Sequence, residues 1–217
     1  MTTTKKAVHW GGLDTEAQED RQRAQALESP GNYHGNIAAA ELHWVDGNRW
    51  LCRDPDSEEW RGFDASTGES RDYPDTGSSW RPWQQALDDS DAPFYRWFSG
   101  ARTNACFNEV DRHILRGRGA HHAFVFEGDR WDPSKNDGRG GPVFELAIDY
   151  RRLLVETVLR AEVLTSLGLK KGDRVAFNLP NIPEQLYYTE AAKRLGIIYT
   201  PVVGGFSAKT LSDRIAD

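Results

Sequence analysis

Residues 168–217 read GLKKGDRVAFNLPNIPEQLYYTEAAKRLGIIYTPVVGGFSAKTLSDRIAD, and two structural patterns alternate along this stretch. The mostly apolar runs 174–178 and 197–203 are typical of buried strands bounded by turn residues. Residues 182–195 between them have helical spacing, and Gly196 is the residue expected after a last helical turn. The order strand, helix, strand predicts two parallel strands joined by a crossover helix.

This arrangement predicts a ligand crevice, because open α/β sheets bind ligands beyond the carboxyl ends of their strands. The loops 178–183 and 204–207 lie at that edge. Gly204 and Gly205 lack side chains, so a thin ligand can approach the backbone there. Ser207 can N-cap a final helix, and the free N–H groups at the start of that helix attract an anion. A plain turn from strand to helix also explains a glycine pair. The candidate ligand-binding residues are Gly204, Gly205, Phe206 and Ser207.

Four segments, taken in order, resemble one family. They are YRWFSG at 95–100, NEVDRH at 108–113, KKGDRVAFNLPNIPEQ at 170–185 and AAKRLGIIYTPVVGGFSAKTLSDRI at 191–215. They are similar to the N-terminal region of acetyl-CoA-synthetase-type acyl-CoA synthetases, which belong to the adenylate-forming superfamily. The resemblance covers roughly residues 92–217 and is closest to a fusion-type member of the family. The residues before this range resemble ordinary members poorly.

The resemblance implies an α/β fold, namely the N-terminal portion of an adenylate-forming domain with parallel βαβ units. It implies an enzyme that joins a carboxylate to ATP with Mg²⁺ and then transfers the acyl group to CoA. In the family the glycine pair borders the channel for the pantetheine arm of CoA, and Gly205 occupies the position concerned. Val203 departs from the family pattern, in which Phe is usual.

The fusion-type resemblance implies 3-hydroxypropionate as the acyl substrate, followed by a hydratase domain and an NADPH-dependent reductase domain. The chain shows no Ser/Thr/Gly-rich loop ending in Pro-Lys, so the triphosphate loop and the acyl pocket are expected beyond residue 217. This segment alone is therefore not expected to be active. We predict no catalytic residue and no metal site within it, and a homo-oligomer is possible.

Composition narrows the class of protein. The chain has 217 residues, a formal net charge of -6 and a mean hydropathy of -0.68, and no apolar run approaches the ~20 residues of a membrane span. The negative charge argues against nucleic acid as a partner. Its two cysteines fit a reducing cytoplasm better than a disulfide framework, and the first residues show no secretory signal.

The charge is uneven along the chain. Residues 1–98 contain 10 Lys and Arg against 18 Asp and Glu, whereas the rest contains 17 against 15. This shift supports a boundary near residue 90. We therefore expect an acidic N-terminal extension at 1–91 and the first part of the synthetase domain at 92–217.

The extension is predicted to be a small layer of one helix and two β-hairpins. Residues 14–29 form a polar helix ended by Pro30, and hairpins centre on Asp46-Gly47 and on 64–68. Seven of the eight tryptophans lie at or before Trp97. We expect them to form the core of the extension or to dock it onto the next domain. A platform that binds a ligand by stacking is the less expected alternative.

Between this layer and residue 168 the patterns are shorter. Residues 82–87, 93–98 and 107–115 are predicted to be helices, and two strands at 123–127 and 143–148 flank a polar loop. The Gly138-Arg139-Gly140-Gly141 run in that loop lacks the Lys-Ser/Thr of a phosphate-binding P-loop. A long helix capped by Asp149 follows, with an apolar stripe for the sheet. The stripe comprises Leu153, Leu154, Thr157, Val158, Ala161, Leu164 and Leu167.

Two polar pairs invite a catalytic interpretation. Asp111 and His113 lie two residues apart, but such a pair on a helix more often belongs to a polar network that joins segments. His121 and His122 are adjacent at the start of a strand, so their rings point to opposite faces and cannot share a metal.

Two other classes of function remain open from the sequence. The chain could be a non-catalytic docking or scaffold module that uses its tryptophan-rich layer. It could also be a small flavodoxin-like nucleotide-binding domain, because alternation of strands and helices is common to many α/β folds.

Overall fold

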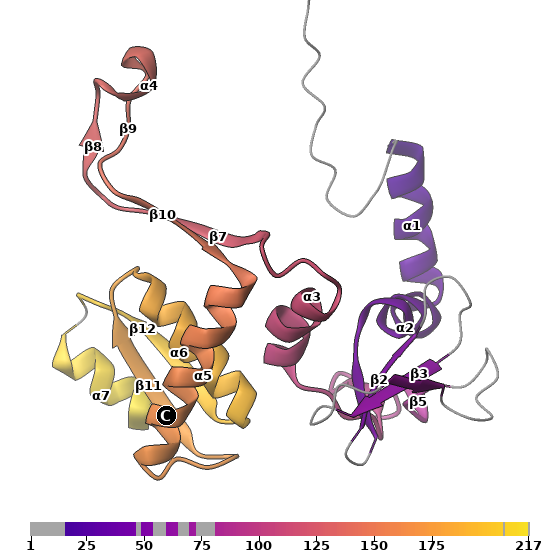
Figure 1. Ribbon diagram of the computed structural model, residues 1–217. Helices are drawn as coiled ribbons and strands as arrows, with labels where there is room; N and C mark the ends of the chain where they lie inside the picture. The colour runs from indigo at the N-terminus through magenta and orange to yellow at the C-terminus, as the bar shows by residue number, and fades with distance from the viewer. Residues whose placement is uncertain are drawn as a thin grey trace, which may run out of the picture. The chain divides into compact units, whose positions relative to one another are not determined.

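The computed structural model describes residues 16–46, 49–53, 60–64, 70–72, 81–205 and 207–216. The chain divides into two compact units, Met1–Thr103 and Asn104–Asp217. Helices and strands alternate in the second unit, so the chain is an α/β protein as predicted, consistent with the N-terminal part of an adenylate-forming domain (Figure 1). None of the helices in these ranges is long and apolar enough to cross a bilayer.

The first unit combines two helices with antiparallel strands. Within the described ranges β1 to β4 form a four-stranded sheet in sequence order, and β5 pairs with β6 in a separate hairpin. Its elements are α1 (Glu16–Glu28), α2 (Pro30–Glu41), β1 (Trp44–Asp46), β2 (Arg49–Arg53), β3 (Trp60–Asp64), β4 (Ser70–Asp72), β5 (Gln85–Asp88) and β6 (Arg96–Ser99). Both predicted hairpins are confirmed by these pairings, although their turns lie outside the described residues.

Tryptophans form the core of this unit. Trp44, Leu51 and Trp60 are buried, and the rings of Trp83 and Phe98 pack against that of Trp44 with centroids 5.0 and 5.3 Å away. The indole N–H of Trp44 donates to the Ala38 carbonyl at 3.2 Å, so the buried ring has a hydrogen-bond partner. The core role predicted for the tryptophans is confirmed at these positions.

One local prediction in this unit is confirmed in part, and another is wrong. α1 ends at Glu28, just before Pro30 as predicted, but Pro30 then begins a second helix, α2, that was not predicted; proline at this first position costs no hydrogen bond. Residues 82–87 and 93–98 are not helices, because Gln85 and Leu87 of β5 pair with Ser99 and Trp97 of β6. The spacing of apolar residues in such short runs does not distinguish a helix from a strand, so their conformation depends on pairing with another strand.

The second unit is where strands and helices alternate. A short π-helical turn, η1 (Phe107–Asp111), leads into α3 (Arg112–Leu115), and an antiparallel hairpin of β7 (His122–Glu127) and β10 (Glu145–Asp149) follows. Between them lies the excursion β8 (Trp131–Asp132), α4 (Lys135–Gly138) and β9 (Gly141–Pro142). Then come α5 (Tyr150–Ser166), β11 (Arg174–Leu179), α6 (Pro183–Leu195), β12 (Ile198–Val203) and α7 (Ala208–Ala216).

The predicted parallel pair is confirmed. β11 and β12 run parallel with Arg174 opposite Ile198 and Leu179 opposite Val203, and α6 connects them. Gly196 ends α6 in the left-handed conformation at φ 70°, as its position after the last turn predicts. The two strands therefore leave the sheet at neighbouring positions on one edge.

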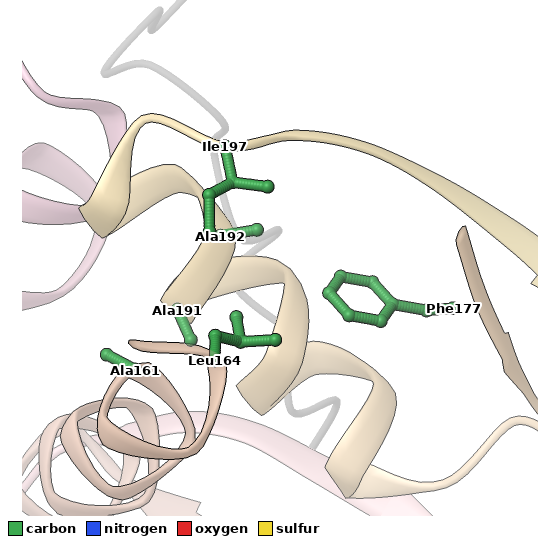
Figure 2. Close-up of a cluster of buried hydrophobic side chains, with 6 residues drawn as sticks. All are labelled: Ala161, Leu164, Phe177, Ala191, Ala192 and Ile197. Atoms are coloured by element: carbon green, nitrogen blue, oxygen red, sulfur yellow. The ribbon is translucent and has the colours of Figure 1, made fainter. Parts of the chain in front are cut away.

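A small apolar core holds the helices to this sheet. Figure 2 shows Phe177 of β11 facing Leu164 of α5 and the alanines of α6. The core is made of Ala161, Leu164, Phe177, Ala191, Ala192 and Ile197. Small alanines let α5 and α6 approach closely, and Phe177 fills the space between helices and strand.

The long helix α5 agrees with its prediction in part. The Asp149 carboxylate accepts a hydrogen bond from the Arg152 N–H at 2.8 Å, which confirms the N-cap. Leu153, Thr157, Ala161 and Leu164 are buried, but Leu167 is 72 % exposed. The buried stripe is narrower than predicted, because Val158 is also exposed and Leu167 lies beyond Ser166, the last helical residue.

Replacement of Phe177 by Ala should destabilise the protein by about 3 to 5 kcal/mol, because it removes the largest side chain of this core and leaves a cavity. Urea unfolding followed by circular dichroism measures the change. Phe94→Ala is the matched control, since Phe94 is 75 % exposed. A loss below about 1 kcal/mol for Phe177→Ala would show that the core does not depend on this ring.

Candidate functional site

The two loops predicted to form a crevice meet through their backbones. The Gly204 N–H donates to the Leu179 carbonyl at 3.1 Å. A Cβ atom on Gly204 would lie 2.8 Å from the Pro180 nitrogen and 3.1 Å from the Leu179 carbonyl carbon. Only glycine allows this approach, so Gly204 joins the exit of β12 to the exit of β11.

Gly205 faces open space. Its φ is 130°, and a Cβ atom there would meet no heavy atom of the described residues within 4 Å. The residue is exposed, so this part of the wall is not sealed within the core. Gly204 is therefore needed for close packing, whereas Gly205 keeps a surface free of side chains.

Ser207 begins the next helix. Its hydroxyl oxygen accepts a hydrogen bond from the Thr210 N–H at 3.3 Å, so the N-cap predicted for α7 is confirmed. The positive end of α7, which begins at Ala208, lies a few residues after the exposed Gly205 and makes this loop favourable to negative charge. Phe206, the fourth candidate ligand-binding residue, lies outside the described residues.

A groove of about 500 Å³ lies beside the first of these loops. It runs between β7, the first turns of α6 and β12, so its lining mixes apolar rings with amides, carboxylates and one phenol. The lining residues are Phe124, Val125, Phe126, Glu127, Asp129, Asn181, Ile182, Pro183, Gln185, Leu186, Thr189, Tyr199 and Pro201. Gly204 and Gly205 are not among them.

Sequence reasoning missed most of this groove. Its β7 wall is separated from α6 by more than fifty residues, and no local pattern relates the two. The run Asn181-Ile182-Pro183 was the usable signal, because a strand exit that leads into a proline-started helix marks the edge of the sheet.

The opposite end of α6 is fastened to residues 104–111. The side-chain amide of Asn104 donates to the carbonyls of Lys193 and Arg194 at 3.2 and 3.0 Å, and its oxygen accepts from the Phe107 N–H at 3.1 Å. One side chain thus caps the last turn of α6 and the first turn of η1. This bridge fixes where β12 begins, and thereby where Gly204 and Gly205 lie.

Ion pairs reinforce the same junction. The Lys193 amine lies 2.5 Å from the Glu109 carboxylate and 2.7 Å from that of Glu190, and Arg194 pairs with Asp111. Burial raises the pKa of Glu190 and that of Asp111, although Lys193 and Arg194 act in the opposite direction. Burial also disfavours the charged form of Lys193, but its hydrogen bonds to Glu109 and Glu190 outweigh this effect and raise the pKa of the amine.

These contacts explain the pair Asp111 and His113. Asp111 belongs to the polar junction with Arg194, as predicted, and His113 stacks on the Tyr150 ring with centroids 4.5 Å apart. Cys106 is buried at the same junction, where the loss of water contact raises the pKa of its thiol to about 12. Such a thiol is a poor nucleophile at neutral pH.

Two regions of the chain match the models of known protein families. Residues 78–108 match the family described as acetyl-coenzyme A synthetase N-terminus, and residues 144–217 match the AMP-binding enzyme family. Over these ranges the chain is similar to acyl-CoA synthetases, as the resemblance in its motifs predicted.

The relatives are acetyl-coenzyme A synthetases. The chain is 35% identical over 182 residues to that of Cupriavidus pinatubonensis, covering 83% of the chain and 25% of the relative. It is 36% identical over 180 residues to that of Methylobacillus flagellatus (82% and 24%), and 42% identical over 140 residues to that of Mycobacterium bovis (64% and 20%). The chain thus spans about a quarter or less of the length of these relatives.

The similarity to known sequences also begins earlier in the chain than residue 92, where we expected it to start. The first matched region begins at residue 78, and an alignment of 182 residues is longer than the stretch 92–217. Part of the acidic N-terminal region therefore resembles ordinary acetyl-coenzyme A synthetases, and the expectation of a poor match there is wrong for that part.

Gly204→Ala should lower the free energy of unfolding by about 1 to 3 kcal/mol, because the added methyl group overlaps the backbone of Leu179 and Pro180. Chemical denaturation measures the loss. Gly128→Ala is the control, since a Cβ atom there would have its nearest neighbour at 3.4 Å, and should shift stability by no more than about 1 kcal/mol. Equal shifts in both variants would argue against close contact between the loops.

Glu190→Gln should change how stability depends on pH. The folded-state pKa of Glu190 lies above its ordinary value of 4.5, so its stabilising contribution is complete below that pH and is lost as the pH rises through the folded pKa. The wild type should therefore lose stability relative to the variant when the pH is raised from about 4 to about 7. Paired urea titrations at both pH values measure the difference, and an opposite sign would contradict the inferred burial effect.

Proposed function

We propose that this chain is the N-terminal segment of an ATP-dependent acyl-CoA synthetase, with an extension at 1–91 and the first part of the synthetase domain at 92–217. The observation that supports it best is the contact of the two strand exits, which leaves Gly205 exposed beside the start of α7. The similarity to acetyl-coenzyme A synthetases supports the same assignment.

In the proposed reaction a carboxylate oxygen attacks the α-phosphorus of Mg²⁺-bound ATP, and pyrophosphate leaves. The CoA thiol then attacks the acyl carbon, and AMP leaves. The residues of this chain would serve the second step, because Gly205 leaves room for a thin thiol-bearing arm and Gly204 holds the wall in place. The N–H groups at the start of α7 would attract a negatively charged portion of the ligand.

The substrate and the wider protein follow from the motif resemblance. We propose that the complete protein is a propionyl-CoA synthase, in which this domain converts 3-hydroxypropionate to its CoA thioester. A hydratase domain would then remove water, and a reductase domain would use NADPH to form propionyl-CoA. A cytoplasmic location agrees with a chain that has only two cysteines, of which Cys106 is buried.

A docking module is the second candidate function. Phe94, Tyr95 and Trp97 around the β5–β6 hairpin are all more than 40 % exposed. Trp97 also lines an apolar groove of about 370 Å³ with His34 and Ile37 of α2. Exposed aromatic groups around a groove are typical of protein contacts, so this hairpin favours a partner-binding role for the first unit.

Gly205→Leu in the complete protein separates the two steps of the proposed reaction. The larger side chain should leave ATP–pyrophosphate exchange with 3-hydroxypropionate unchanged and slow thioester formation about 100-fold, because it narrows the approach of the thiol. Both rates are measured on the same preparation. Gly138→Leu is the matched control, since Gly138 also has a positive φ, of 82°, and open space around it within the described residues.

Two outcomes would contradict the proposal. Equal rates of thioester formation in both variants would show that Gly205 does not border the path by which CoA reaches the acyl group. An in-frame stop codon directly after residue 217 would exclude a synthetase, whereas a Thr/Ser/Gly-rich loop ending in Lys within about a hundred residues would support it.

A further inference from the structure

One side of β7 is an unpaired strand edge. β7 pairs with β10 on its other side (Figure 1), and within the described ranges no further strand pairs with it. An edge of this kind presents backbone N–H and C=O groups to which another extended chain can bind. We call this side of β7 the free edge.

The register of the hairpin shows which residues face the free edge. The Gly128 N–H donates to the Phe144 carbonyl at 2.8 Å, so the hydrogen bonds to β10 are made at Gly128 and at every second residue before it. Val125 and Glu127 are the residues in between. Their N–H and C=O groups therefore point away from β10, and both residues are exposed.

The groove of about 500 Å³ runs along this edge. Four consecutive residues of β7, Phe124 to Glu127, line it, whereas the residues of β10, all of which the structure describes, do not. Side chains alternate between the two faces of a strand, so a groove lined by consecutive residues of one strand follows the edge of that strand. The opposite wall belongs to α6 and β12. The groove therefore has the place and the direction of an added strand.

One face of such an added strand would meet apolar side chains. The Phe124 ring packs against that of Tyr187 on α6 with centroids 6.4 Å apart, so the face of β7 that carries Phe124 and Phe126 is turned toward α6. The apolar and aromatic residues of the opposite wall are Ile182, Pro183, Leu186, Tyr199 and Pro201. Every second side chain of the added strand should accordingly be apolar.

The other face is acidic. Glu127 lies directly opposite Glu145 in a pair whose backbones are not hydrogen-bonded to each other, the arrangement in which facing side chains come closest. Like charges placed in this way repel each other. Within the described ranges neither carboxylate has an ion-pair partner, and the groove is lined by Asp129 as well but by no Lys or Arg. A basic side chain beside Glu127 would offset this repulsion.

We propose that the free edge of β7 binds an extended segment of a partner protein in which apolar and basic side chains alternate. Hydrogen bonds to the backbone of Val125 and Glu127 supply affinity, while the apolar wall and the acidic face select the side chains. A small ligand would leave the backbone groups of the edge unused. The inference goes beyond the proposed function, since this binding requires neither ATP nor CoA.

Titration calorimetry of the 217-residue chain with a blocked hexapeptide of alternating valine and lysine tests the proposal. Val125→Pro removes an N–H that faces the free edge but no hydrogen bond to β10, so the hairpin should remain folded while peptide binding weakens about tenfold or more. Ala147→Pro is the matched control, because Ala147 lies opposite Val125 and its N–H points to the far side of the hairpin. It should leave the affinity unchanged. Circular dichroism and urea unfolding of both variants measure whether the fold is kept.

Two further comparisons separate charge from backbone bonding. Glu127→Gln should weaken binding about threefold or more, whereas Glu162→Gln, which removes an exposed carboxylate of α5, should not. A peptide of the same sequence with methyl groups on its amide nitrogens keeps its charge but cannot donate to β7, so it should not bind.

Four results would overturn the proposal. They are the absence of saturable binding by the unmodified peptide, equal binding of the methylated peptide, equal losses in Val125→Pro and Ala147→Pro, and binding to this chain but not to the complete protein. The last result would mean that a later segment of the same protein occupies the free edge. None of these results depends on the rates of adenylate or thioester formation, so failure here is distinguishable from failure of the proposed function.

Discussion

The parallel pairing of β11 with β12 is the constraint on which the site depends. Parallel register places the exits after Leu179 and Val203 side by side, and the hydrogen bond from Gly204 to Leu179 joins them. α6 and α7 each begin after one of these exits, so their positive ends lie at the same edge. An antiparallel pair would separate the exits by the length of a strand.

Contacts distant in sequence keep this pair in place. α6 spans the connection between the strands, and Asn104, Glu109 and Asp111 fasten its last turn. A buried polar junction of this kind contributes more to a unique geometry than to stability, because burial offsets much of the charge attraction. Asn104, Glu109 and Asp111 thus set the position at which β12 starts, and hence the position of Gly205, although they have no direct role in binding.

Local signals in the sequence predict the elements of the second unit well. Asp149, Gly196 and Ser207 each mark a helix end by their own chemistry, and the structure shows the hydrogen bond or backbone angle expected of each. Residues 82–98 are mispredicted because their conformation depends on strand pairing. The need for glycine at position 204 was not predictable, since it arises from close contact with Pro180 and Leu179, which lie in a different loop.

The double cap formed by Asn104 also has a consequence for biosynthesis. Its partners Lys193 and Arg194 lie 89 and 90 residues further along the chain, so at typical rates of synthesis they emerge roughly 4 to 18 s later. Throughout that interval residues 104–111 lack the helix that covers them in the folded protein. The Cys106 thiol, unreactive once buried, is most open to oxidation and to chaperones while translation is still in progress.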